Sequence, residues 1–204
     1  MKVHYRLFIV LLLSALFAGC ASTGEPLNVT IQSREVWNAT PPRPFKVHVP
    51  DKITVHHEGT FFDPAKHNAA DHIKRVQTWG MGPDRKWIDI PYHFLIDFDG
   101  VIYEGRNVFT VGETNTEYDP SGHLLISCLG NFEEQEVGEK TLNALTELLA
   151  YSCKKYDISP DSIKTHRDYA KTSCPGKNMY KYFSDGTMVK RVKEILKSRQ
   201  IQGI

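Results

Sequence analysis

The stretch Ile90-Pro91-Tyr92-His93-Phe94-Leu95-Ile96-Asp97-Phe98-Asp99-Gly100-Val101-Ile102-Tyr103-Glu104-Gly105 decides the fold at the centre of the chain. Its two halves are rich in aromatic and β-branched residues, which favour strands. They are separated by Asp99-Gly100, a pair typical of the tight turn of a hairpin. We therefore predict an antiparallel hairpin, with Tyr92 and Phe94 on the same face of its first strand.

Apolar periodicity on both sides of this hairpin predicts further strands and helices. Two apolar, β-branched runs end at turn residues and predict strands, and three segments repeat apolar residues at helical spacing. A Pro-rich run over residues 40–44 fits neither a helix nor a central strand, so we expect it to wrap the surface. The predicted strands are 52–57 and 123–129; the predicted helices are 140–156, a surface helix over 187–199, and one that opens at Asp63-Pro64 and extends to residue 79.

The composition is that of one globular domain. The chain has 204 residues, of which 41% are hydrophobic and 24% are charged. Its 25 basic and 24 acidic side chains nearly balance, which argues against a nucleic-acid partner. We expect a monomer.

The first 20 residues have the pattern of an export signal. A basic start is followed by an apolar run over residues 7–17, which is too short to span a bilayer as a helix. Ala18-Gly19 before Cys20 resembles the lipobox of bacterial lipoproteins, although Phe17 replaces the usual leucine. We predict a signal peptide over 1–19, a linker over 20–30 lipidated at Cys20, and one folded domain over 31–204. The alternative is ordinary cleavage nearby, with Cys20 unmodified.

This pattern also predicts where the protein is located. A lipidated Cys20 would anchor an exported protein to a bacterial membrane, in our expectation the outer membrane, facing the periplasm. Export would allow a disulfide between Cys128 and Cys153. We favour two buried thiols instead, because both residues lie in strongly apolar strand and helix patterns.

Residues 164–176, Lys-Thr-His-Arg-Asp-Tyr-Ala-Lys-Thr-Ser-Cys-Pro-Gly, place an imidazole and a thiol eight positions apart. Pro175-Gly176 interrupts regular structure, so the segment can fold back as a loop that brings His166 and Cys174 to one metal ion. On spacing alone, a polar histidine and a buried cysteine explain the pair equally well. A catalytic zinc site needs a third protein ligand and an open position, whereas a structural site needs a fourth ligand.

A third ligand is available at the end of the predicted strand Lys52–His57. His56 and His57 lie on opposite faces of this strand, so only one of them can face a given site. The strand pattern alone leaves both histidines as candidates for the third ligand.

Six segments occur in the order found in one known family, and together they cover roughly residues 31–182. The segments are Ser-Arg-Glu-Val-Trp (33–37), Val-His-His (55–57), Trp-Ile-Asp-Ile-Pro-Tyr-His-Phe-Leu (87–95), Asp-Gly-Val-Ile-Tyr-Glu-Gly-Arg (99–106), Leu-Gly-Asn-Phe (129–132) and the loop from His166 to Gly176. They resemble the peptidoglycan recognition protein and N-acetylmuramoyl-L-alanine amidase family. The resemblance implies an α/β fold with a central mixed β-sheet flanked by helices, and Zn²⁺ as cofactor.

The resemblance also implies roles for single residues. Zinc would be held by a strand-end histidine together with His166 and Cys174. Gly59 stands where bacterial members carry a small residue if His56 is the first ligand, so we favour His56 over His57. Tyr92 falls on the active-site tyrosine of the family, and Thr172 falls where relatives carry Lys or Thr.

Two further residues are implied in substrate binding. In the resembling family, an arginine at the position of Arg106 and a tryptophan at that of Trp87 accompany recognition of meso-diaminopimelate. Its extra carboxylate calls for a fixed cation, and we therefore predict a preference for stem peptides that contain it. The alternative is a solvated arginine, or one paired with Glu104.

Three positions depart from the family pattern. Lys86 precedes Trp87 where a glycine is usual, and Thr114 stands in place of a histidine. Gly80 stands where relatives carry a histidine after the first helix. These departures concern substrate contacts.

The predicted function is zinc-dependent hydrolysis of the amide between N-acetylmuramic acid and L-alanine in peptidoglycan. One alternative is a lipoprotein that binds peptidoglycan fragments without cutting them, but such family members typically lose the cysteine ligand. A second is a hydrolase in which Cys174 is the nucleophile and His166 its base. A third is a structural zinc site with His57 or His93 as fourth ligand.

Overall fold

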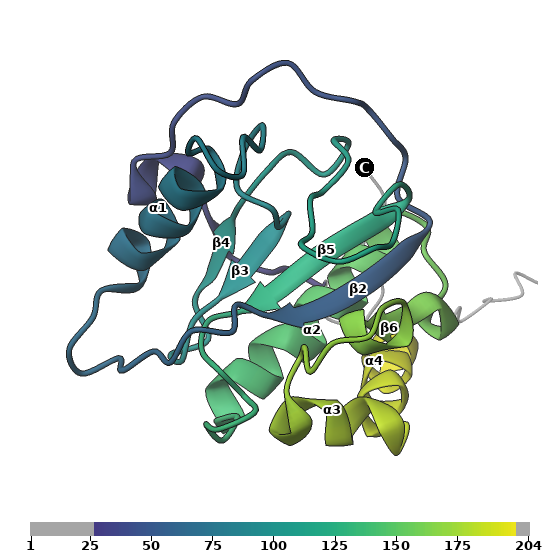
Figure 1. The fold of residues 1–204 in the computed structure, drawn as a ribbon. Helices are drawn as coiled ribbons and strands as arrows, with labels where there is room; N and C mark the ends of the chain where they lie inside the picture. Colours follow the sequence, from purple (N-terminus) through teal and green to yellow (C-terminus); the bar gives the residue numbers. More distant parts are fainter. Residues whose placement is uncertain (1–26, 199–204) are drawn as a thin grey trace, which may run out of the picture.

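Six short strands form one mixed β-sheet in the computed structural model, which describes residues 27–198 (Figure 1). The strand order is β1-β4-β3-β5-β2-β6, and only the β3–β4 pair is antiparallel among these six. Helices lie against both faces of the sheet, so the predicted α/β fold is confirmed. The strands are β1 (Ile31–Gln32), β2 (Lys52–His57), β3 (Phe94–Ile96), β4 (Ile102–Glu104), β5 (His123–Cys128) and β6 (Ile163–Thr165).

The predicted hairpin is β3 and β4, and its turn contains Gly100 at a φ of +77°. That backbone conformation favours glycine, as the Asp-Gly pair indicated. The predicted strands over 52–57 and 123–129 are β2 and β5. β1 and β6 were not predicted, because strands of two or three residues are too short to show alternation.

Four α-helices surround the sheet: α1 (Ala69–Gly80), α2 (Glu139–Lys155), α3 (Lys177–Ser184) and α4 (Thr187–Ser198). The predicted start of the first helix at Asp63 is wrong. The helix begins at Ala69 because the Asn68 side chain caps it, accepting a hydrogen bond from the backbone N–H of Asp71 at 3.1 Å. α3 was not predicted, since it starts directly after Pro175-Gly176. The predicted surface helix, α4, buries Met188 completely.

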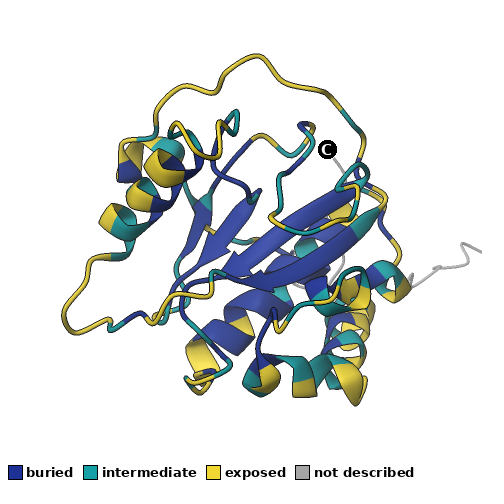
Figure 2. Cartoon of the chain, viewed as in Figure 1, coloured by how far each residue is buried: buried dark blue, intermediate teal, exposed yellow. Residues whose placement is uncertain are grey.

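The two faces of the sheet are covered differently (Figure 2). On one face Ile53 and Val55 belong to a large apolar cluster that includes buried residues of α2, α3 and α4. On the other face a smaller cluster joins Leu95 to α1 and to the 3₁₀ helix η1 (Arg34–Trp37). This smaller cluster contains no residue of β2 or β6. The part of this face that carries His56 is thus left for a site.

Segments outside the sheet match the expectations in part. The chain between η1 and β2, dark blue in Figure 1, forms a long arc whose Pro-rich residues 41–45 are exposed, as predicted. Leu27 is buried in the main cluster, so the folded part starts before residue 31. Signal peptide and Cys20 lie outside the described residues.

Cys128 and Cys153 are separate buried thiols, which confirms the preferred alternative to a disulfide. Burial raises the pKa of the Cys153 thiol to about 12. Among residues 27–198, no helix has the length and apolar character needed to cross a bilayer.

Candidate metal centre and groove

Three side chains that the sequence singled out lie together at the edge of the open face. Ligand atoms of His56, His166 and Cys174 are all within 4.8 Å of one another, and all three residues are buried. His56 comes from β2, His166 begins the 3₁₀ helix η3 (His166–Asp168) directly after β6, and Cys174 lies in the loop before α3. Cys174 Sγ is 3.6 Å from Nδ1 of His56. Parallel pairing of β2 with β6 brings the histidines together.

His57 points to the other face of the sheet. Its Nδ1 accepts a hydrogen bond from the backbone N–H of Phe132 at 3.1 Å, and its own backbone N–H donates to Cys174 Sγ at 3.3 Å. His93 is occupied too, because its Nδ1 accepts from the Leu125 N–H and its Nε2 lies 2.8 Å from the Thr110 carbonyl oxygen. Within residues 27–198 the metal-ligand group therefore has three members and no fourth.

Burial shifts the pKa of each of the three residues. Burial, with the neighbouring His166, lowers the pKa of His56 well below its usual value, and burial lowers the pKa of His166 to about 4. Both imidazoles are therefore neutral, as metal ligands must be. Burial raises the pKa of the Cys174 thiol to about 12 despite the N–H of His57. This is the reverse of a thiolate–imidazolium pair, in which the pKa of the cysteine is low.

The donor set also fits zinc. One thiolate and two imidazoles are ligands that Zn²⁺ takes in tetrahedral sites, and three protein ligands leave one position open. His56 Nε2 is buried without a hydrogen-bond partner among the described residues. That ring is fixed by packing, since it lies 4.6 Å from the ring of His166 and 5.4 Å from the ring of Tyr92 between centroids.

Two threonines of the loop before β5 contact His166. The sequence singled out Thr114 as a departure from the family pattern, but it indicated neither Thr116 nor this role. Thr116 Oγ1 lies 2.5 Å from His166 Nε2, and Thr114 Oγ1 lies 3.5 Å from it. The two hydroxyl oxygens are 2.9 Å apart. On the other side, Asp168 Oδ2 accepts hydrogen bonds from the N–H and hydroxyl of Thr165, which fixes the start of η3.

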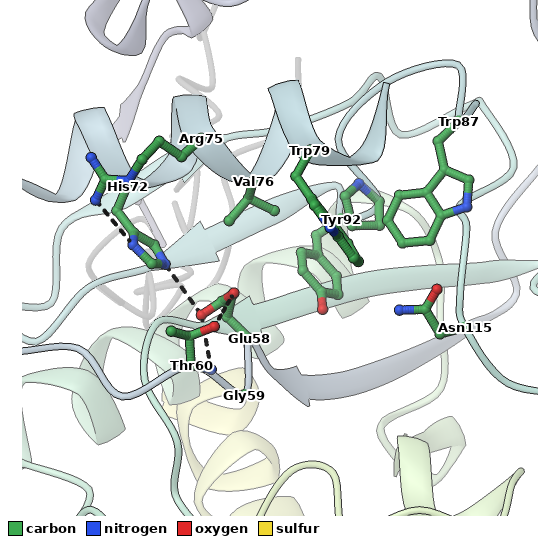
Figure 3. Close-up of a pocket in the computed structure, with 11 residues that line it drawn as sticks. Glu58, Gly59, Thr60, His72, Arg75, Val76, Trp79, Trp87, Tyr92 and Asn115 are labelled. Atoms are coloured by element: carbon green, nitrogen blue, oxygen red, sulfur yellow. Dashed lines mark hydrogen bonds and ion pairs between the residues drawn. The ribbon is translucent and has the colours of Figure 1, made fainter. Parts of the chain in front are cut away.

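The cluster opens into a groove made of two adjoining cavities. The smaller, about 180 Å³, contains the three cluster residues, and the larger, about 470 Å³, extends toward α1 (Figure 3). Both share one set of lining residues, so they are continuous. The shared residues are Glu58, Trp87, Pro91, Tyr92 and Asn115.

Tyr92 and Thr172 lie where they can touch a molecule in this groove. Tyr92 lines both cavities, and burial together with the nearby Cys174 raises the pKa of its hydroxyl, which stays protonated at neutral pH. It can therefore donate a hydrogen bond. Thr172 lines the smaller cavity, and its Oγ1 accepts from the backbone N–H of Cys174 at 3.2 Å.

Comparison with known families shows to which family the chain belongs. The family described as N-acetylmuramoyl-L-alanine amidase matches residues 46–177, a span that contains all three cluster residues and Tyr92. The chain belongs to this amidase family.

Proteins similar to this chain include recognition proteins and amidases. Peptidoglycan-recognition protein SC2 of Drosophila simulans is 30% identical over 175 residues, which cover 84% of this chain and 91% of the relative. The structure of peptidoglycan recognition protein-LE with tracheal cytotoxin aligns at a TM-score of 0.67 and 31% identity, over 76% of this chain and 92% of that one. The N-acetylmuramoyl-L-alanine amidase LysC from Clostridium intestinale aligns at 0.64 and 26%, over 78% and 99%.

Trp87 lines both cavities of the groove, and the absence of a side chain at Gly80 leaves space for its ring. A Cβ atom at Gly80 would lie 2.6 Å from Cε3 of Trp87. The backbone N–H of Trp87 also donates to the Gly80 carbonyl at 2.9 Å. A side chain at position 80 would therefore require Trp87 to shift.

Arg106, predicted to bind the extra carboxylate of meso-diaminopimelate, does not present a free cation to the groove. Its side chain is 1% exposed and forms an ion pair with Glu113. The same guanidinium donates to the carbonyl oxygens of Ile90, Asp89 and Val111. Arg106 therefore joins the loop before β5 to the segment before β3, and it reaches the site only through that loop.

Proposed function

We propose that this chain is a zinc-dependent enzyme that hydrolyses the amide between N-acetylmuramic acid and L-alanine in peptidoglycan. The observation that carries the proposal is the three-residue cluster of His56, His166 and Cys174, which opens into a groove lined by Tyr92. Membership of the amidase family supports it, and so do the Clostridium intestinale amidases among similar structures. Several recognition proteins in the same comparison support peptidoglycan as the ligand.

His56, His166 and Cys174 would hold the metal. When bound there, Zn²⁺ supplies a Lewis acid that polarises a carbonyl and lowers the pKa of water. The protein residues supply orientation and a proton donor. Tyr92, a protonated hydroxyl on the groove wall, donates a hydrogen bond to the oxygen on which negative charge develops. Thr172 fixes the amide of Cys174 and keeps its own hydroxyl hydrogen available to the same part of the groove.

Aromatic side chains form one wall of the groove next to the cluster. Trp87 and Tyr92 line both cavities, so a substrate lying along the groove would be covered by aromatic surface near the cluster. A lower local dielectric strengthens the hydrogen bond from Tyr92. The larger cavity, away from the cluster, would receive the part of the substrate that does not react.

Binding of peptidoglycan without cleavage is the second candidate, because the Drosophila relatives are described as recognition proteins. The presence of Cys174 in the cluster favours cleavage. A cysteine-nucleophile mechanism is less well supported, since burial keeps the pKa of this thiol high and the pKa of His166 low.

The deciding experiment measures zinc content and peptide release together. Purified protein should contain about one zinc per chain and should release peptides from peptidoglycan fragments. Chelation should stop release, and added Zn²⁺ should restore it. His56→Ala should abolish both metal binding and release, whereas His67→Ala, which changes an exposed histidine, should alter neither. Full release by metal-free protein would refute the zinc mechanism, and zinc binding without any release would favour the recognition protein.

We also propose that the protein is exported and anchored through lipid on Cys20, in a bacterial outer membrane with the domain in the periplasm. The basic start, the short apolar run and the small residues before Cys20 support this location. It would place the groove next to peptidoglycan.

A further inference from the structure

We propose that Arg75 on α1 binds a carboxylate of the stem peptide at the end of the groove away from the metal cluster. This inference rests on peptidoglycan being the ligand, and it names a specificity-determining residue for it. The larger cavity lies between α1 and the loop after β2, and Arg75 lines it beside His72 and Val76 (Figure 3). No other lysine or arginine lines this cavity within residues 27–198.

Arg75 is exposed, and it forms no ion pair with a described carboxylate. One hydrogen-bonding contact holds it, from Nη2 to Nδ1 of His72 at 3.4 Å. A planar guanidinium carries five N–H donors, so most of them remain free for a ligand. The side chain is therefore an available cation in a groove.

A short chain of hydrogen bonds positions this cation. His72 Nε2 lies 3.2 Å from Glu58 Oε2, and the opposite ring nitrogen faces Arg75. When Nε2–H donates to Glu58, the Nδ1 lone pair is left to accept from the guanidinium. Glu58 and His72 are each only 12% exposed, so this support is nearly shielded from solvent. His72 is thus a positioning residue for Arg75.

Glu58, the carboxylate in the groove, does not form an ion pair with Arg75. Glu58 accepts hydrogen bonds from the Thr60 N–H at 3.1 Å and from the Thr60 hydroxyl at 2.9 Å, in addition to its contact with His72. Its two oxygens are occupied by protein donors. An incoming carboxylate would meet Arg75 on the exposed side of this network.

The other cations near the groove contact protein groups. Arg85 stacks on Trp79, with 4.7 Å between its guanidinium carbon and the ring centroid, and donates to Asn115. Lys74 donates to the Thr40 hydroxyl at 2.7 Å. Arg106 is buried. Of these four cations, Arg75 is the one that lines the larger cavity.

The ligand chemistry follows from the shape of a guanidinium. Its planar fork suits a bidentate contact with a carboxylate better than with a neutral sugar hydroxyl. Stem peptides carry free carboxylates, and one with meso-diaminopimelate carries one more than a peptide with lysine. The groove end thus favours the peptide part of a muropeptide.

Calorimetry with the free stem peptides L-Ala-γ-D-Glu-meso-diaminopimelate and L-Ala-γ-D-Glu-L-Lys tests the proposal, since peptide binding does not require hydrolysis. Arg75→Gln should weaken binding of the diaminopimelate peptide about tenfold or more, as expected for a charge-assisted hydrogen bond. Arg75→Lys should retain part of the affinity. Lys154→Gln, which removes an exposed charge from α2, controls for net charge and should bind like the parent.

The pattern across the two peptides locates the carboxylate. A loss confined to the diaminopimelate peptide assigns Arg75 to the carboxylate of the third residue, and an equal loss on both peptides assigns it to another carboxylate of the stem. Unchanged binding of both peptides by Arg75→Gln would overturn the proposal. His72→Phe should give a smaller loss in the same direction, because it removes the support and keeps the charge.

This outcome is separable from that of the amidase proposal. Charge-dependent binding by a protein that releases no peptide would leave Arg75 in its role and remove the catalytic function. Peptide release with no dependence of binding on Arg75 would do the opposite.

Discussion

Thr116 Oγ1 and His166 Nε2 lie 2.5 Å apart, although the two residues are separated by 50 positions in the chain. If Nε2–H donates to this hydroxyl, the Nδ1 lone pair of His166 is left free for a metal. The loop that carries Thr116 is tied in turn to the segment before β3 by Arg106. The orientation of one candidate ligand thus depends on a loop outside the sheet.

Thr116→Val keeps the shape of the side chain and removes the acceptor for His166. We expect zinc affinity to fall about 10-fold to 100-fold, the range usual for residues that support a metal ligand. Competition with a chromophoric chelator measures this directly. Thr78→Val removes an exposed hydroxyl of α1 that bonds only to its own helix, so it should keep the parent affinity. Equal affinity in both variants would show that Thr116 does not orient the ligand.

Tyr92→Phe preserves the ring against His56 and removes only the hydroxyl. If that hydroxyl stabilises developing negative charge, kcat should fall about 10²-fold to 10³-fold, with little change in substrate affinity. Initial rates on a soluble muropeptide separate the two effects. Tyr151→Phe is the matched control, because Tyr151 lies on α2 and packs against the main apolar cluster. A Tyr92→Phe enzyme as fast as the parent would make Tyr92 a packing residue.

Cys174→Ser should lose zinc and peptide release while the domain stays folded. Serine fills nearly the same space, but its hydroxyl is not ionised at neutral pH and is a poor zinc ligand. Metal analysis, circular dichroism and a release assay on the same sample check the three parts. Cys153→Ala removes another buried thiol, which belongs to the main apolar cluster and not to the metal-ligand group, and this variant should keep its zinc. Release by Cys174→Ser at the parent rate would count against both a zinc ligand and a nucleophile at this position.

The strand pattern separates His56 from His57, and the fold decides between them. Ile53 and Val55 are apolar and face the main core, so His57, two positions on, must share that face. Thr54 and His56 therefore face the other way, where α1 and η1 leave the sheet uncovered. Periodicity of two, applied to Ile-Thr-Val-His-His, places His56 on the face opposite Ile53 and Val55, and the cover by α1 and η1 in the fold shows that this face is the open one.

Arg106 and Thr116 could not be read in the same way. Glu113, Thr114 and Thr116 lie in an irregular segment before β5, and no periodic pattern there predicts which side chains point inward. Glu113 contacts Arg106 at a separation of 7 residues, and the two threonines contact His166 at separations of 52 and 50 residues. These contacts depend on how the chain folds back, which a local pattern does not predict. An arginine next to a strand is usually exposed, because burial is costly unless a partner is present, and the partner was visible only in the fold.

Cys20→Ser tests the proposed location. Acylation would add roughly 0.8 kcal/mol of membrane affinity for each buried methylene, and more than one chain anchors a protein stably. We expect the parent protein in the membrane fraction and the variant in the soluble fraction of the exporting cell. Cys153→Ser, which changes a buried thiol inside the domain, should fractionate like the parent. Membrane association that survives Cys20→Ser would refute the lipid anchor at this residue.

Arg106→Met should destabilise the domain rather than change its preference among stem peptides. The substitution keeps much of the aliphatic volume, but it leaves Glu113 without its cation and removes the donors to the carbonyls of Ile90, Asp89 and Val111. Breaking a buried ion pair from one side costs about 3–5 kcal/mol, so the urea midpoint should fall sharply. Arg75→Met, which removes an exposed arginine, should leave the free energy of unfolding within about 0.5 kcal/mol of the parent value. Measured at a temperature where the variant is still folded, the ratio of rates on diaminopimelate and lysine substrates should equal that of the parent. A change in this ratio with the stability unchanged would return Arg106 to the substrate site, and the two assays together therefore separate a residue that holds the fold from one that reads the peptide.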